Sequence, residues 1–198
     1  MHLAELRAKW NGTASLRGVF RSMVHLFGTY PSGGAGVAYL DVLCDGVPAS
    51  SNSYDYGVSL LQGAGGSWEK RLTAHELGHN FSSPHSHCYV PELDRCYNAE
   101  SGCYSGPVVA STGDVMSYCS AKTNSFHQRV IDERLRPGAM AAYPSCVAVA
   151  GSPGMVGASA QSGLVVARAG SCASQDLVND DNGRNGSYGY SGSTQAMN

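Results

Sequence analysis

The sequence contains few charged residues and no marked excess of either sign. Asp, Glu, Lys and Arg make up 14% of its 198 residues, against about 25% in average soluble proteins, and the formal net charge is −2. Without a basic excess there is no electrostatic basis for binding nucleic acid or an anionic membrane surface. We therefore expect neither as a partner, and the composition indicates no oligomeric state.

Long apolar runs are also lacking. No segment approaches the roughly 18 consecutive apolar residues of a membrane-spanning helix. Residues 1–18 (MHLAELRAKWNGTASLRG) do not contain the apolar core of a signal peptide. The sequence therefore predicts no membrane span, and no export signal is found in this chain.

Cysteine is plentiful, but the paired C-x-x-C spacing of thiolate zinc sites and redox pairs is missing. The seven cysteines are Cys44, Cys88, Cys96, Cys103, Cys119, Cys146 and Cys172. Disulfides formed in an oxidising compartment explain so many cysteines best, and an odd number leaves at least one of them outside an intramolecular pair. Because disulfides conflict with the lack of an export signal, we expect a secreted protein whose natural start precedes residue 1.

Local patterns predict strands first and a helix after them. Residues 22–27, 37–43 and 56–61 are short and rich in β-branched and aromatic residues, which favours strands. From 67 to 81 the pattern becomes helical, with Ser67 as a candidate cap.

The segment after this helix changes in character. Residues 82–114 contain many Ser, Gly, Pro and Cys residues without a clear period, which indicates an irregular, cross-linked region. Residues 125–136 predict a second helix, ended by Pro137 and Gly138.

The composition divides the chain into two regions. Residues 1–147 contain all the predicted elements and form one domain, whereas 148–198 are dominated by small and polar residues such as Gly, Ser and Ala. We expect this second region to be a linker or a truncated extension that is largely disordered.

Four histidines gather in residues 73–88, which read TAHELGHNFSSPHSHC. On a helix, His75 and His79 lie one turn apart on the same face, so both imidazoles can bind one tetrahedral zinc ion. Glu76 points to a neighbouring part of the helix surface. This H-E-x-x-H pattern is typical of a Lewis-acid zinc with a carboxylate general base that acts on one water.

A third ligand is required, and His85 supplies it if the chain turns sharply after the helix. The run from His75 to His85 then follows H-E-x-x-H-x-x-G-x-x-H, with Ser82 in place of the glycine. Glycine suits a turn whose backbone conformation costs a residue with a Cβ about 1 kcal/mol. His87, two residues further on, is the alternative third ligand, which the spacing favours less.

These motifs resemble the reprolysin-like (adamalysin-type) metzincin zinc proteases, particularly their secreted bacterial and fungal members. The resemblance extends from about Ser22 to Cys146 and includes VHLF, VAYLDVLC, AHELGHNFSSPHSHCY, CYNAESGCYSG, DVMSYC and PSC. It implies His75, His79 and His85 as zinc ligands, Glu76 as general base and Met116 as the methionine of the turn beneath the zinc. Tyr118 matches a tyrosine that stabilises the transition state in astacin-like and serralysin-like relatives.

The resemblance also implies a fold and a set of disulfides. The expected fold is α+β and zincin-like: a twisted mixed sheet with the active-site helix, then a small irregular disulfide-linked subdomain. Residues 37–43 would be the edge strand that pairs with an extended substrate. Only residues 1–66 precede the predicted helix, so we expect the first strands and at least one long helix of the family to be missing. The implied disulfides are Cys44–Cys146, Cys88–Cys119 and Cys96–Cys103, with Cys172 left over.

The sequence therefore predicts a zinc-dependent endopeptidase that acts on proteins or peptides. Two alternatives stay open. One is a non-catalytic zinc-binding fragment or pseudo-protease of the same fold. The other is a disulfide-rich structural module in which the histidines coincide by chance.

Overall fold

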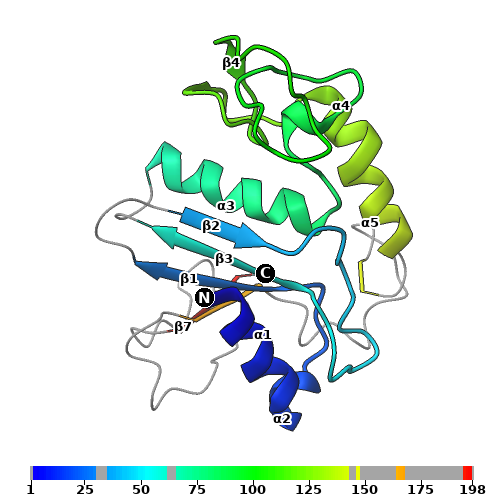
Figure 1. The fold of residues 1–198 in the computed structure, drawn as a ribbon. Coiled ribbons are helices and arrows are strands. Elements are labelled where there is room, and N and C mark those ends of the chain that lie inside the picture. Colours follow the sequence, from blue (N-terminus) through cyan, green and yellow to red (C-terminus); the bar gives the residue numbers. More distant parts are fainter. Residues whose placement is uncertain are drawn as a thin grey trace.

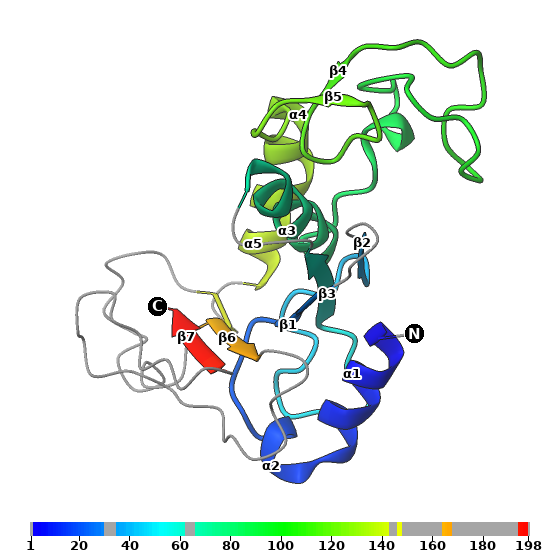
Figure 2. The ribbon, with the colours of Figure 1, turned by 90° about the vertical axis from the view of Figure 1, so that its left-hand side faces the viewer.

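The computed structural model describes residues 2–29, 35–61, 66–142 and 146–147, and the backbone of strands at 164–167 and 194–197. A three-stranded sheet is covered by α1 (His2–Gly12) on one face and by α3 (Ser67–Asn80) on the other (Figure 1). Figure 2 shows the irregular segment after α3 on the far side of this helix from the sheet. The helix that carries the H-E-x-x-H motif thus lies between two halves of the molecule.

The sheet has the order β1-β3-β2, with β3 (Tyr56–Leu61) in the centre. β3 runs parallel to β1 (Val24–Thr29) and antiparallel to β2 (Ala35–Ala38). The prediction of a strand at 56–61 is confirmed. The central strand is buried over its first four residues, whereas the edge strand β2 is only partly covered.

The prediction of a strand over 37–43 is wrong beyond Ala38, because the backbone there binds a helix end instead of a neighbouring strand. The N–H of Asp41, which has a φ of 59°, donates to the carbonyl of His79 at 2.9 Å. The N–H groups of Val42 and Leu43 donate to the carbonyl of Asn80 at 3.0 and 3.1 Å. These bonds satisfy carbonyls that the last turn of a helix leaves without partners.

No element is predicted from the sequence for residues 2–12, yet they form α1, which is followed by the short α2 (Ala14–Arg17). Helix α1 packs its apolar residues onto the sheet, in a core made of Leu3, Trp10, Val24, Tyr56 and Val58. The sheet face opposite α3 is therefore covered by the first residues of the chain.

A buried ion pair fixes the end of the sheet nearest α1. Arg21 Nε lies 2.7 Å from Asp55 Oδ2, and the exposed fractions of the two side chains are 5% and 0%. Arg21 Nη2 donates to Asp55 Oδ1 at 3.1 Å and to Ser53 Oγ at 3.2 Å. The Tyr56 hydroxyl donates to Asn11 Oδ1 at 2.6 Å, so the network joins the end of α1 to the start of β3.

Helix α3 ends in a Schellman motif. The N–H of Ser83 donates to the carbonyl of Gly78 at 3.0 Å, and the N–H of Ser82 donates to the carbonyl of His79 at 2.9 Å. Ser82 occupies the position that usually holds glycine, and its φ of 80° lies in the left-handed region. Ser82 thus adopts the left-handed backbone conformation for which the metzincin pattern uses glycine.

The predicted second helix is a continuous helical segment made of α4 (Gln128–Val130), the π-helical η2 (Ile131–Leu135) and α5 (Arg136–Ala142). The prediction that it stops at Pro137 is wrong. A proline inside a regular helix lacks one hydrogen bond and clashes with the carbonyl four residues earlier. The preceding π-turn, in which the N–H of Arg136 donates to the carbonyl of Ile131, widens the helix just before the proline and allows it to continue.

Three disulfides cross-link the described part of the chain: Cys44–Cys146, Cys88–Cys103 and Cys96–Cys119. The first is the long-range pair that the resemblance implies. The expected pairs Cys88–Cys119 and Cys96–Cys103 are wrong, since Cys88 is bonded to Cys103 and Cys96 to Cys119. The N–H of Tyr104 donates to the carbonyl of His87 at 3.0 Å, and this contact brings Cys103 next to Cys88.

The remaining described elements are short. They are η1 (Ser86–Cys88), the parallel pair β4 (Thr112–Gly113) and β5 (Ala121–Lys122), and the antiparallel pair β6 (Leu164–Ala167) and β7 (Thr194–Met197). Apart from β6 and β7, the expected linker at 148–198 lies outside the described residues, as does Cys172. Among the described helices, none is long and apolar enough to cross a membrane.

Removal of the Asp55 carboxylate should destabilise the fold strongly. We expect Asp55→Ala to lower the free energy of unfolding by about 3–5 kcal/mol, because Arg21 would keep a buried charge without a partner. Glu92→Ala is the matched control, since Glu92 pairs with Arg95 at a solvent-accessible position and its loss should change little. Chemical denaturation measures both, and equal effects would contradict a structural role for the buried pair.

Replacement of Ser82 by glycine should stabilise the turn after α3. We expect Ser82→Gly to raise the free energy of unfolding by about 1 kcal/mol, because glycine has no Cβ to strain at positive φ. Ser83→Gly, one residue further along the same turn, should instead destabilise the protein, since the buried Ser83 hydroxyl hydrogen-bonds Tyr89. A destabilising Ser82→Gly would show that the left-handed turn carries no strain.

Candidate metal centre

His75 and His79 face each other on α3. Their Nε2 atoms lie 3.1 Å apart, while His75 Nδ1 lies 2.8 Å from the carbonyl oxygen of Val115 and His79 Nδ1 lies 2.7 Å from that of Ser83. A carbonyl oxygen only accepts hydrogen bonds, so each imidazole carries its proton on Nδ1. The two Nε2 lone pairs therefore point into the same space.

This arrangement fits a metal ion. Two unprotonated nitrogens at 3.1 Å repel each other unless a positive charge lies between them. Imidazole nitrogens bound to one tetrahedral zinc at about 2.0–2.1 Å stand about 3.3–3.4 Å apart, close to the spacing found here. The donor set of neutral nitrogens suits zinc or a similar transition metal.

His85 completes the group. The Schellman turn reverses the chain after α3, and the His85 ring comes to lie 4.7 Å from the His79 ring, measured between centroids. His75, His79 and His85 each offer one ligand atom, and these three atoms lie within 4.8 Å of one another. The structure thus brings together the three histidines that the sequence singles out.

His87, the alternative third ligand, does not point toward His75 and His79. Its ring is fully buried and stacks behind that of His85, with centroids 5.4 Å apart and an interplanar angle of 7°. Its Nε2 lies 2.9 Å from Glu100 Oε2, the oxygen that also lies 2.7 Å from His85 Nδ1. Glu100 therefore holds both rings, and His87 is not among the three converging imidazoles.

Burial sets the protonation of the site. It is the main cause that lowers the pKa of His75 to about 3 and that of His79 to about 4, and it also lowers the pKa of His85. All three imidazoles are therefore neutral at pH 7, the form that binds a metal ion.

Glu76 lies beside the group, against the edge strand. Only 4% of the residue is exposed, and burial raises the pKa of its carboxyl to about 8. A metal ion at the histidines would oppose this shift and favour the carboxylate. A Cβ on Gly36 of β2 would overlap the Glu76 carboxyl, so glycine is what lets the strand approach it.

Met116 packs beneath α3 without any exposed surface. A Cβ on Gly78 would come within 2.5 Å of Met116 Sδ, so the helix can lie close to this methionine only with glycine there. The carbonyl of Met116 accepts from the N–H of Ser86 at 3.1 Å. Asp114 accepts from the hydroxyl of Ser86 and, at 2.8 Å, from the N–H of His127, which fixes this turn to the chain on both sides.

Tyr118 stands at the opening of the site, with 45% of its surface exposed. Its ring centroid lies 4.3 Å from that of His85 and 6.1 Å from that of His75. The side chain is thus close to the histidines.

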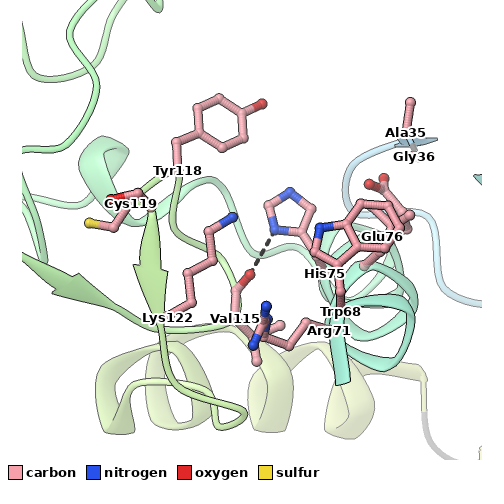
Figure 3. Close-up of a pocket in the computed structure, with 12 residues that line it drawn as sticks. Ala35, Gly36, Trp68, Arg71, His75, Glu76, Val115, Tyr118, Cys119 and Lys122 are labelled. Carbon is pink, nitrogen blue, oxygen red and sulfur yellow. Dashed lines mark hydrogen bonds between the residues drawn. The ribbon is translucent and has the colours of Figure 1, made fainter. Parts of the chain in front are cut away.

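Two cavities meet at this group. The larger, of about 500 Å³, is shown in Figure 3 and is lined by residues of α3, β2 and the segment 115–122. The smaller, of about 290 Å³, extends past Val37, Leu40 and Pro84. Both share Gly36, His75, Glu76 and Tyr118. The metal-binding group and Glu76 therefore lie at the middle of a continuous cleft along β2.

Two features of the site were not predicted from the sequence. Glu100 lies in an irregular disulfide loop, where no periodicity could place its carboxylate beside His85. Arg71 and Lys122 line the larger cavity but are 51 positions apart in the sequence, so only the fold brings them close together. A carboxylate between closely spaced cysteines after the third histidine was the one available signal for Glu100.

The comparison with protein families finds a match. The sequence model of metallo-peptidase family M12, in its reprolysin form, matches residues 3–127, which is more than half of the chain. A search of curated proteins finds no match. The matched region begins well before Ser22, so the first helix belongs to it together with α3, the three histidines and Met116. The chain belongs to metallo-peptidase family M12, a family of peptidases that act on protein substrates.

Proposed function

We propose that this chain is a zinc-dependent metalloendopeptidase that hydrolyses peptide bonds in proteins. The observation that carries the proposal is the pair of Nε2 lone pairs of His75 and His79, which face each other at 3.1 Å while both ring protons are bound elsewhere. His85 supplies the third nitrogen. Zinc, when bound there, supplies a Lewis acid that polarises the peptide carbonyl and activates a water molecule.

Glu76 is the general base in this proposal. Its carboxyl is buried between α3 and β2, beside His75 and at the junction of the two cavities, where a peptide bond and a water would meet. The carboxylate takes the proton from the attacking water and gives it to the departing amine nitrogen.

The edge strand offers a means to hold the substrate. Among the described strands β2 has a neighbour on one side only, and in this proposal an extended peptide forms backbone hydrogen bonds with its other side. A peptide paired with residues 35–38 would pass directly over Glu76 and the histidines. In this proposal Tyr118, whose ring centroid lies 4.3 Å from that of His85, would donate its hydroxyl proton to the charge that develops on the carbonyl oxygen.

The protein is proposed to work outside the cell. Three disulfides within one domain are typical of proteins that fold in an oxidising compartment. Two of them cross-link the irregular region around the site, where Cys88–Cys103 closes the loop that carries Glu100.

The variant Glu76→Gln separates catalysis from metal binding. We expect it to retain about one zinc per chain, because glutamine keeps the size of the side chain, and to lose activity on casein by about 10²–10⁴-fold, because the amide cannot accept the proton. Elemental mass spectrometry and a casein digestion assay, run on the oxidised wild type and on the variant, measure the two properties.

The wild type decides between the remaining alternatives. One zinc per chain without chelator-sensitive proteolysis would identify a non-catalytic zinc-binding fold, and no zinc would contradict the metal site. Activity that survives in Glu76→Gln would contradict the assigned base.

Glu100 should set the affinity of the site for zinc. We expect Glu100→Gln to weaken zinc binding by about 10–100-fold, because the carboxylate that orients His85 is lost. Competition with a chromophoric chelator gives the dissociation constant without any need for activity. Glu92→Gln removes a carboxylate from the same irregular segment and should leave the dissociation constant unchanged; an equal loss in both would contradict the role of Glu100.

A further inference from the structure

The two cavities of the cleft carry opposite charges. Arg71 of α3 and Lys122 of β5 line the larger one, whereas the carboxylate of Glu100 lines the smaller one. A peptide that lies along β2 would pass from a positively charged space to a negatively charged one, with Glu76 and the histidines between them. The charges are therefore sorted along the direction in which a substrate would extend.

The two cations of the larger cavity have no carboxylate in direct contact within the described part of the chain, although Asp94 and Asp114 act on Lys122 from further away. Within the described part of the chain neither Arg71 nor Lys122 forms a salt bridge. Arg71 Nη1 donates to the amide oxygen of Asn124 at 3.2 Å, which leaves its charge in place. Both residues are partly buried, so their charges are only partly solvated, and a carboxylate from a ligand would gain more there than at an open surface.

The direction of Lys122 indicates where such a carboxylate would lie. Figure 3 shows its amino group directed into the space between Tyr118 and His75, with Arg71 below it and the Trp68 ring on the opposite wall. Trp68, Leu72 and Val115 supply apolar surface to the same cavity. The arrangement suits a side chain with an apolar stem and a negatively charged end.

We propose that the larger cavity selects substrates that place a carboxylate next to the cleaved bond, and that Lys122 and Arg71 are the residues that recognise it. This inference rests on the proposed function for the position of the cleaved bond. The carboxylate has two possible sources, a Glu or Asp side chain within the peptide or the free end of a short peptide. Either source would meet the same two cations.

The test measures peptide binding and cleavage separately. Fluorescent heptapeptides that carry Glu, Gln or Lys at each position in turn are titrated into the zinc-loaded Glu76→Gln protein, and anisotropy gives their affinities. A second set compares a free carboxylate with an amide at the C-terminus. We expect Glu to bind about tenfold more tightly than Gln at one position, and Lys more weakly than Gln. A preference confined to the free C-terminus would identify the chain end as the carboxylate.

Charge variants assign the preference to the cavity. In the same background Lys122→Met should reduce the preference for Glu to about twofold, and Lys122→Glu should reverse it in favour of Lys. Arg71→Gln should also reduce the preference for Glu over Gln, independently of the Lys122 variants. Lys70→Met is the matched control, because Lys70 is exposed on α3 one residue from Arg71 and lines neither cavity, so the preference should persist.

The outcomes separate this inference from the proposed function. Equal binding of the Glu and Gln peptides at every position, or a preference unchanged by the Lys122 and Arg71 variants, would overturn the inference even if the wild type cleaves casein. The expected preference together with no cleavage of any peptide by the wild type would support the carboxylate pocket and overturn the proteolytic function.

Discussion

The site depends on how the C-terminal end of α3 satisfies its carbonyl groups. The backbone of residues 41–43 donates to the carbonyls of His79 and Asn80, and the Schellman turn at Ser82 and Ser83 donates to the carbonyls of Gly78 and His79. The first set of bonds fixes the segment that follows β2 to the metal-binding helix. The second reverses the chain so that His85 returns to the helix. One helix end thus positions both the segment after β2 and His85, the third histidine of the candidate metal site.

A second layer of acceptors fixes the direction of each imidazole. The carbonyls of Val115 and Ser83 and the carboxylate of Glu100 each hold the Nδ1 atom of one ring, so the remaining nitrogen of each is left for the metal. These three acceptors come from the Met116 turn, the end of α3 and a disulfide loop. The irregular half of the molecule therefore contributes the orientation of the ligands more than the ligands themselves, which explains why it is cross-linked twice.

The sequence predicted what short spacings determine and missed what distant contacts determine. The two histidines one helical turn apart, Glu76 between them, and the special backbone at Ser82 all follow from local geometry, and the structure shows each in the expected place. The edge strand is shorter than predicted because the backbone N–H groups of residues 41–43 donate to carbonyls of α3. The second helix continues through Pro137 because a π-turn precedes the proline. Two of the disulfides join other cysteine pairs than expected. The edge strand and the disulfides depend on contacts between distant segments, and the π-turn departs from the regular helix that the residue pattern predicts.

The three histidines also link the binding of a metal ion to the stability of the fold. Burial lowers the pKa of all three imidazoles and keeps them neutral, and the positions of the ring protons of His75 and His79 direct two lone pairs toward each other at 3.1 Å. Such an arrangement is unfavourable in itself, and the fold holds it through the packing of Met116 under Gly78 and the ties of Asp114. An ion that binds the three nitrogens turns this repulsion into attraction, and because it binds the folded chain more tightly than the unfolded one, it stabilises the fold in proportion to its affinity. The same geometry that brings the three nitrogens together would therefore make the folded state favour a bound metal ion.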